Sequence, residues 1–430
     1  MFVKIKNMQK WWKILFLVLL VITLLALFEI DLNGQGLETR ANIIEIVNSP
    51  ETPQQDPVTP QWALLDKILE PDPEFDNIKL FLGDKDIIYY ENVPARDARG
   101  IIRKNKKTGK DIIQSIKRRD KEREVALKIL NTSNGETETI KIRKKGDQLI
   151  NPPGYTVEVV QRPNGIRWNA HNTYYRVIEP QNRVVIRNAW PDIKTVNKKR
   201  VVENKAYVPF SKEIATLEAI EKGHNDLTNI VSEAKNRLRQ NGVMSKAFPD
   251  RLVADVLPDE FYRRRAIMER TDLGEIIIDP KETVNMFFAI LGTNGSNSFS
   301  SCNSAPACGM FQFTDKGKNG TYRTVVRTYP KANLIKDFKT GSLDHVNSAM
   351  AAMLLDDSNL GSLVKKYGAK IYTDQRLEEY LAASYNGAPR WVTKSLDATL
   401  SKNVSNWGKY LKSETEGFMV KLDLLKRIDI

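Results

Sequence analysis

Three segments in the last third of the chain carry side chains that could bind or transform a ligand. The first is an apolar stretch, 286–292, that runs into a loop containing Asn294. The second starts fifteen residues after Asn294 and consists of Gly309, Met310, Phe311 and Gln312. The third ends an apolar helical segment with Tyr385 and Asn386. Amides donate and accept hydrogen bonds and a tyrosine ring can stack, so residues of these types can bind a ligand.

In this order and spacing, the three segments resemble the lytic transglycosylases and goose-type lysozymes. That family has a helix ending in a catalytic glutamate, then Gly-Leu-Met-Gln or a variant, then Ala-Tyr-Asn-x-Gly. Residues 309–312 match the second element, with Phe311 in place of methionine, and 385–387 match the third. The resemblance covers about residues 255–430 and implies a mainly α-helical, lysozyme-like domain, in which residues 30–250 take no part.

The resemblance also implies an activity: cleavage of the bond between N-acetylmuramic acid and N-acetylglucosamine in peptidoglycan, without metal or cofactor. One carboxylic acid would protonate the glycosidic oxygen. The same group, now a base, would help the sugar's 6-hydroxyl close a 1,6-anhydro ring, unlike the usual two-carboxylate scheme. The acid must be protonated to act, and a partly apolar pocket achieves this by raising its pKa.

The sequence departs from the family at the acid itself. The family's interval before Gly309 ends on Asn294, and an amide cannot act as a proton donor. Three explanations stay open. The domain binds glycans without cleaving them, as a scaffold in a cell-envelope machine; or Asn294 replaces a parental glutamate; or another acid serves. The nearby acids are Glu269, Glu282 and Asp315.

The other motif residues also have purely structural interpretations. Gly309 could serve a tight turn, and Met310 and Phe311 could belong to the core. Gln312 is harder to place in a core, because its amide needs partners, so we predict that it binds sugar or organises the site. Tyr385 could cap the core, and Asn386 could stop a helix.

The two cysteines of the chain, Cys302 and Cys308, stand just before the Gly309 motif. In an exported protein this pair predicts a disulfide that stiffens the wall of the cleft, and in the cytosol it would be a reduced pair. The three histidines are scattered, and no further ligands cluster with the cysteines. The sequence therefore predicts neither a metal site nor a cofactor.

The N-terminus predicts export. Four lysines and no acid occur within residues 1–13, and 14–28 are apolar. This pattern is typical of a signal-anchor that leaves the N-terminus in the cytoplasm and the bulk of the protein outside. A cleaved signal peptide is the alternative, but the segment lacks a small-residue cleavage site. The membrane is thus one expected partner, and peptidoglycan glycan strands are the other, with envelope-machinery proteins as further candidates.

The predicted class is α+β. We expect a transmembrane helix (1–30), a Pro-rich tether (31–70), a small β-rich domain (71–208), a helical connector (209–254) and the lysozyme-like domain (255–430). Within the β-rich domain, Asn134-Gly135 predicts a hairpin between 125–130 and 137–142. Two further hairpins are expected, one joining 157–160 to 166–168 and one joining 174–178 to 184–186. A helix is expected over 212–240, stopped by Asn241-Gly242.

The net charge is +13, which suits an anionic partner or simply a lysine-rich surface. Basic residues concentrate in 103–123 without interleaved aromatic residues. A nucleic-acid surface would need such residues for stacking, so the run argues against a nucleic-acid partner. A solvated exposed segment is the simpler interpretation, and attraction to anionic lipid or wall polymer is the alternative.

Overall fold

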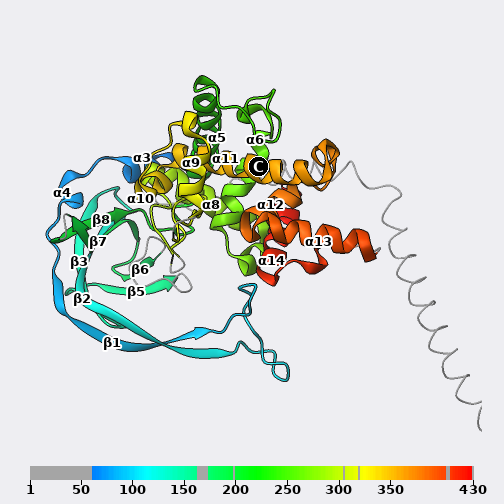
Figure 1. Ribbon diagram of the computed structural model, residues 1–430. Coiled ribbons are helices and arrows are strands. Elements are labelled where there is room, and N and C mark those ends of the chain that lie inside the picture. Colours follow the sequence, from blue (N-terminus) through cyan, green and yellow to red (C-terminus); the bar gives the residue numbers. More distant parts are fainter. Residues whose placement is uncertain are drawn as a thin grey trace, which may run out of the picture. The chain divides into compact units, whose positions relative to one another are not determined.

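The computed structural model describes residues 61–161, 173–196, 199–303, 306–317, 320–402 and 407–428. The predicted membrane anchor and the tether up to residue 60 lie outside these ranges. Within them, no helix combines the length and the apolar character needed to cross a membrane. A strand-rich region is followed by a mainly helical region (Figure 1), which confirms the α+β class.

The strand-rich region consists of two short helices and then antiparallel strands. Its elements are α3 (Gln61–Leu69), α4 (Pro73–Asp76), β1 (Leu82–Pro94), β2 (Ile113–Asn131), β3 (Thr137–Lys145), β4 (Gln148–Ile150), β5 (Thr156–Gln161), β6 (Tyr174–Glu179), β7 (Arg183–Val196) and β8 (Lys199–Tyr207). The main sheet has the order β4-β3-β2-β7-β8, with β1 also paired to β2, and β5 and β6 form a second sheet. Apolar side chains such as Val125, Ile142 and Tyr175 fill a core between them.

The hairpin predicted around Asn134-Gly135 is confirmed. Strand β2 pairs with β3, with Leu130 opposite Thr137, and Gly135 has a φ of 75°. For the second hairpin, 157–160 lies in β5, but 166–168 falls outside the described residues. The third, pairing 174–178 with 184–186, is wrong. Both edges of β7 are hydrogen-bonded, to β2 and to β8, so β6 pairs with β5 instead.

Strand β1 and the first half of β2 form a long two-stranded arm. The pairing runs from Leu82 opposite Arg123 to Pro94 opposite Ile113, and we call residues 95–112 between the strands the arm tip. The basic run 103–123 is therefore not one solvated segment. Residues 103–111 are exposed, whereas further along the arm Arg118 pairs with Glu91, and the buried Asp120 pairs with Arg123 and Lys144.

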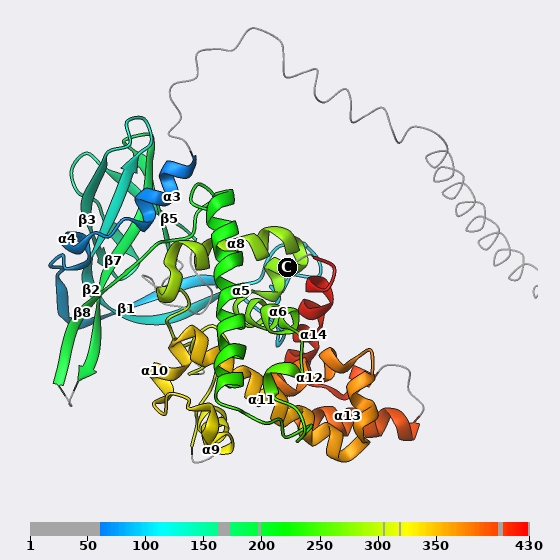
Figure 2. The ribbon, with the colours of Figure 1, turned by 90° about the horizontal axis from the view of Figure 1, so that it is seen from above.

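The helical region is built from ten helices in the described ranges. They are α5 (Leu217–Gln240), α6 (Asp259–Arg270), α7 (Leu273–Ile278), α8 (Pro280–Asn294), α9 (Thr321–Thr328), α10 (Phe338–Leu343), α11 (His345–Tyr367), α12 (Leu377–Gly387), α13 (Pro389–Lys402) and α14 (Ser413–Leu425). Seen from above, α6, α12 and α14 lie together beside α11 (Figure 2).

The predicted helix over 212–240 is α5, but it begins only at Leu217. Thr216 caps it, because its side chain accepts a hydrogen bond from the Ala219 N–H, and Asn241 is the C-cap, as expected. Helix α5 packs closely on α8, since a Cβ on Gly292 would lie 2.0 Å from the Ala219 carbonyl oxygen. Its buried face shares one apolar core with α6, α8, α11, α12 and α14, so the predicted connector belongs to the helical region's core.

Candidate active site

A pocket of about 430 Å³ opens among the helices of the C-terminal region. Its lining comes from the ends of α6 and α12, from α14, from the loop around the Gly309 motif, and from one residue of the arm tip. The lining residues are Arg99, Met268, Glu269, Thr271, Asp272, Leu273, Asn303, Ala307, Gln312, Phe313, Thr314, Thr321, Leu355, Tyr385, Asn386, Glu414, Gly417, Phe418 and Lys421.

Glu269 reaches the pocket from the last turn of α6. Two acids in the first turn favour the N-terminal end of this helix, and Phe261, Ala266 and Ile267 on its apolar side are buried. The helix ends at Thr271, which leaves Glu269 partly exposed at the pocket. Within the described part of the chain, its carboxyl forms no ion pair and no hydrogen bond.

Burial raises the pKa of the Glu269 carboxyl to about 7, and the nearby cations Arg265, Lys421 and Arg270 only partly oppose this. Desolvation penalises the charged form, and Asp356 adds a repulsive negative charge. At neutral pH a large fraction of Glu269 is therefore protonated. A carboxyl in this state can donate its proton to a ligand in the pocket.

Lys421 reaches the pocket from α14. Its ammonium donates to the carbonyl oxygens of Met268 (2.8 Å) and Thr271, at the C-terminal end of α6. A cation there satisfies carbonyls that the helix leaves unpaired. Burial lowers the pKa of Lys421, while Glu269 acts to raise it. The lysine ties α14 to the turn that carries Glu269.

The pocket holds two other carboxylates, and their situations differ from that of Glu269. Asp272 caps α7 by accepting hydrogen bonds from the N–H groups of Gly274 (2.8 Å) and Glu275 (3.2 Å), and it also pairs with Arg96. Glu414, in the first turn of α14, is exposed. Glu269 is thus the pocket carboxyl that is both desolvated and uncommitted among the described residues.

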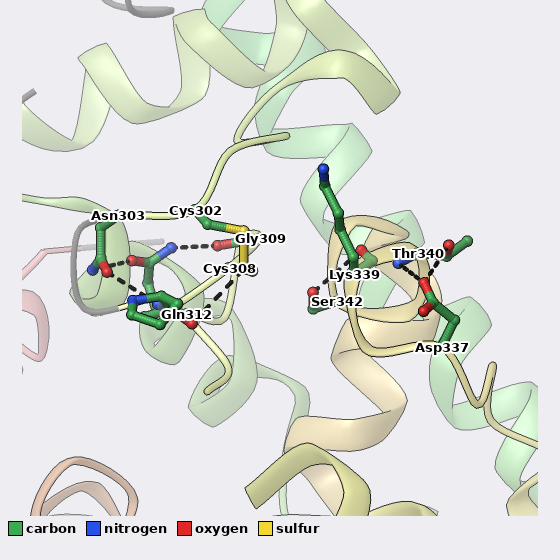
Figure 3. The surroundings of a disulfide bond; sticks show 11 residues. Cys302, Asn303, Cys308, Gly309, Gln312, Asp337, Lys339, Thr340 and Ser342 are labelled. Atoms are coloured by element: carbon green, nitrogen blue, oxygen red, sulfur yellow. Dashed lines mark hydrogen bonds between the residues drawn. A yellow bond between two sulfur atoms is a disulfide. The ribbon is translucent and has the colours of Figure 1, made fainter. Parts of the chain in front are cut away.

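The loop containing the Gly309 motif lies against α10 (Figure 3). Gly309 has a φ of 73°, and a Cβ there would lie 1.7 Å from the Ser342 carbonyl oxygen, so only glycine fits. Met310 and Phe311 are fully buried in the core. Gln312 turns back to the pocket, where its amide donates to the Gly309 carbonyl (2.7 Å) and accepts from Asn303 (3.0 Å).

The predicted disulfide between Cys302 and Cys308 is present. It closes the loop that carries Asn303 and Ala307, which both line the pocket (Figure 3). The Asn303 side chain also accepts a hydrogen bond from the Ala307 N–H (3.0 Å). The bridge therefore stabilises the part of the pocket wall to which the Gln312 side chain is hydrogen-bonded.

Tyr385 and Asn386 enter the pocket from the end of α12. The Tyr385 hydroxyl donates to the Phe311 carbonyl (2.8 Å), which ties α12 to the Gly309 loop, and the Arg265 guanidinium lies 4.4 Å from its ring centre. Asn386 accepts a hydrogen bond from the Thr415 hydroxyl (3.0 Å) on α14. Three of the predicted ligand-binding residues, Gln312, Tyr385 and Asn386, therefore meet at one pocket.

Asn294 is not among the residues that line this pocket. It ends α8, and its amide binds the backbone of Val208, accepting from the N–H (2.8 Å) and donating to the carbonyl (3.0 Å). Two of the alternative acids also lie elsewhere. Asp315 accepts hydrogen bonds from the backbone and side chain of Arg323, and Glu282 is exposed in the first turn of α8.

Sequence reasoning missed two contributors to the pocket, Arg99 and Lys421. It named Glu269 only as one of three alternative acids, although a glutamate at the end of an amphipathic helix, followed by the capping residue Asp272, was a usable signal. The family's interval before Gly309 ends on Asn294 in α8, which does not line the pocket, whereas Glu269 in α6, separated from the motif by α7, α8 and the disulfide loop, does. The assumption that residues 30–250 take no part fails at Arg99.

Groups of three or more histidine, cysteine or acidic side chains able to hold a metal ion do not occur in the described ranges. Comparisons with protein-family models, with curated proteins and with solved structures find no match to this chain.

Proposed function

We propose that the chain is a peptidoglycan-cleaving enzyme of the lytic transglycosylase type, with Glu269 as its single acid and base. The observation that carries this proposal is a desolvated, uncommitted carboxyl at a helix end, in a pocket shared with Gln312, Tyr385 and Asn386. These are the residue types that the family resemblance requires, with the acid provided by α6 instead of α8.

In the proposed reaction, protonated Glu269 gives its proton to the oxygen of the glycosidic bond. The bond from the muramic acid's anomeric carbon to that oxygen breaks, and the N-acetylglucosamine end leaves with a hydroxyl. The Glu269 carboxylate then takes the proton of the 6-hydroxyl. That oxygen attacks the anomeric carbon and closes the 1,6-anhydro ring, so Glu269 ends protonated, as it began.

The other pocket residues have structural, sugar-binding and positioning roles in the proposed reaction. Asp272 is held by two backbone N–H groups and by Arg96, which leaves it a structural role and not that of a second catalytic carboxylate. The amides of Asn303, Gln312 and Asn386 provide donors and acceptors for acetamido and hydroxyl groups. Lys421 acts as a positioning residue, because it holds the carbonyls at the end of α6.

The location of the protein is part of the same proposal. We place the bulk of the chain outside the cytoplasm, anchored through residues 1–30, where a disulfide can persist and the cell wall is accessible. The Cys302–Cys308 bridge supports an oxidising compartment.

The decisive experiment is Glu269→Gln, which keeps the size of the side chain and removes the proton. We expect release of anhydro-muropeptides from purified cell walls, measured by mass spectrometry, to fall by about 10²–10⁴-fold. Glu282→Gln is the matched control, since it removes an exposed acid at the start of α8, and its activity should stay within about twofold of the parent's.

Circular dichroism and thermal melting establish that both variants are folded. If the folded parent releases no product, the enzyme proposal fails, and sedimentation of the protein with intact walls would then favour the glycan-binding scaffold. If Glu269→Gln retains full activity, another group is the acid.

A further inference from the structure

The arm tip forms part of the pocket wall, although it comes from the strand-rich region. Arg96 on the tip pairs with Asp272 on the pocket rim (2.8 Å), and Ile101 packs against the core of the helical region. A Cβ on Gly417 of α14 would lie 3.6 Å from the Cβ of Arg99. Both ribbon views show the arm reaching the helices near α14 (Figures 1 and 2).

Beyond Arg99 the tip is an ordered hairpin. The Arg103 N–H donates to the Ala95 carbonyl (2.7 Å), and the Asn105 N–H donates to the Lys110 carbonyl (2.7 Å). The Asn105 side chain accepts from the Lys107 N–H (2.9 Å) and so shapes the turn. The backbone of this turn is therefore fixed before any ligand arrives, which lowers the entropy cost of ordering it on binding.

Cations outnumber acids on this hairpin, where Asp111, opposite Lys104, is the acid. Between residues 103 and 110 every charged residue is a cation, and each is exposed: Arg103, Lys104, Lys106, Lys107 and Lys110. Among the described residues, none of the four lysines forms a side-chain ion pair. From Arg103 to Asn105 the strand extends about 7 Å at roughly 3.3 Å per residue, and Lys106 and Lys107 lie on the turn beyond it. Cations this close together reinforce one another's potential, because their spacing is near the Debye length.

We propose that the arm tip binds carboxylates on the peptides attached to the glycan strand whose sugars enter the pocket. The inference depends on the proposed function, since a peptidoglycan strand combines a sugar backbone with acidic side branches. Arg99, which pairs with Asp97, lines the pocket, and the first of the lysines follows it by five residues in the same arm tip. We expect a polymer that is held in the pocket and passes over the tip to contact both. An anionic membrane would match the charge of the lysines but not their continuity with the pocket.

The consequence is a preference for strands that carry peptides over bare strands. The charge-neutralising variant Lys104→Gln/Lys106→Gln/Lys107→Gln/Lys110→Gln, made in the full chain, removes the four lysines and leaves the pocket lining intact. The substrates are soluble glycan strands with their peptides and the same strands after enzymatic removal of the peptides. We expect the ratio of kcat/KM on intact strands to kcat/KM on stripped strands to fall roughly tenfold at low salt, and less at high salt.

The matched control neutralises four exposed lysines elsewhere on the helical region, as Lys331→Gln/Lys336→Gln/Lys339→Gln/Lys370→Gln. The change in net charge is the same, so a general charge effect would appear in both variants. In the control, we expect the preference ratio to match that of the parent.

Sedimentation with intact and peptide-stripped walls tests the inference without any turnover. The parent and Glu269→Gln should both bind intact walls more tightly, and the four-lysine tip variant should lose this difference. A parent that cleaves both substrates equally well and binds both walls equally would overturn the inference and leave the proposed function standing. A tip variant that keeps the preference, but loses binding to vesicles of anionic phospholipid, would assign the tip to the membrane instead.

Discussion

At the scale of single residues, the central feature is a carboxyl whose surroundings favour its neutral form. Glu269 lies in the last turn of α6, at the negative end of the helix dipole, which disfavours negative charge. Three cations nearby oppose this, yet desolvation has the larger effect on its pKa. Asp272, three residues further on, is instead committed to the N–H groups at the start of α7. Two carboxyls in one pocket are thus suited to different tasks.

The pH dependence of cleavage follows from this environment. The proton donor is active while it holds its proton, so kcat/KM on glycan strands should fall as the pH rises above about 7, approaching tenfold per unit. Initial rates between pH 5 and 9, with wall binding measured in parallel, check this. A rate that instead rises steadily from pH 6 to 9 would argue against Glu269 as the acid.

The pH dependence of thermal stability tests the raised pKa of Glu269 independently of cleavage. Because the pKa of folded Glu269 lies above its usual value of 4.5, its stabilising contribution is complete below that value and is lost as the pH rises through about 7. Glutamine does not titrate. The melting temperature of Glu269→Gln relative to the parent should therefore increase between pH 5 and pH 8.

At the scale of elements, the pocket is made from the ends of helices and from the loops that join them. The Gly309 loop is placed by one close backbone contact with α10, and the Cys302–Cys308 bridge holds the chain leading into it. The hydroxyl of Tyr385 then joins this loop to α12. The apolar side chains of Met310 and Phe311 anchor the loop in the core, while Gln312 lines the pocket.

Gly309→Ala should disturb this loop strongly. The new Cβ would overlap the Ser342 carbonyl, and a positive φ costs a non-glycine residue about 1–2 kcal/mol even in open space. We expect a loss of roughly 2–4 kcal/mol in the free energy of unfolding, measured by urea denaturation, together with weakened cleavage.

Gly317→Ala is the matched control for backbone conformation, because Gly317 has a φ of +68° and an added Cβ would meet no atom within 4 Å. It should lose only about 1–2 kcal/mol. Equal losses in the two variants would mean that the contact with α10 is unimportant.

At the scale of the whole molecule, the strand-rich and helical regions are joined at several places. Asn294 at the end of α8 binds Val208, just after β8, and Arg96 on the arm tip pairs with Asp272 beside the pocket. Residues 58–430 accordingly form one compact unit. Through the arm, the strand-rich region contributes Arg99 to the pocket wall. The sequence of that region contains no functional motif that predicted this contribution.

Asn294→Glu tests the role of this junction. A carboxylate cannot donate to the buried Val208 carbonyl, so we expect a loss of roughly 1–3 kcal/mol in the free energy of unfolding and no gain in wall cleavage. Asn297→Ala, at an exposed position nearby, serves as the control and should be close to neutral. A clear gain of wall cleavage in Asn294→Glu would indicate instead that position 294, at the end of α8, is the position of the catalytic acid.

The separation into strand-rich and helical regions was predictable because it depends on local pattern. Neighbouring residues were enough to predict the Asn134-Gly135 turn and the end of the helix at Asn241. They also offered a core position for Met310 and Phe311, beside Gln312, as one interpretation. The pairing of β6 was not, since β7 is flanked on both sides by strands distant in sequence. Local pattern cannot indicate which edge of a strand is already occupied.

The sequence by itself indicated that Gln312, in the loop after the disulfide, and Tyr385 and Asn386, at the end of one helix, would contribute to a polar pocket. Only the tertiary structure decided which acid lies there, and that Arg99 joins it from the arm. The reason is physical: residue types and helix ends are properties of short segments. The desolvation that raises the pKa of Glu269 arises from the packing around it, and the opposing charge of Lys421 comes from 152 positions further along the chain.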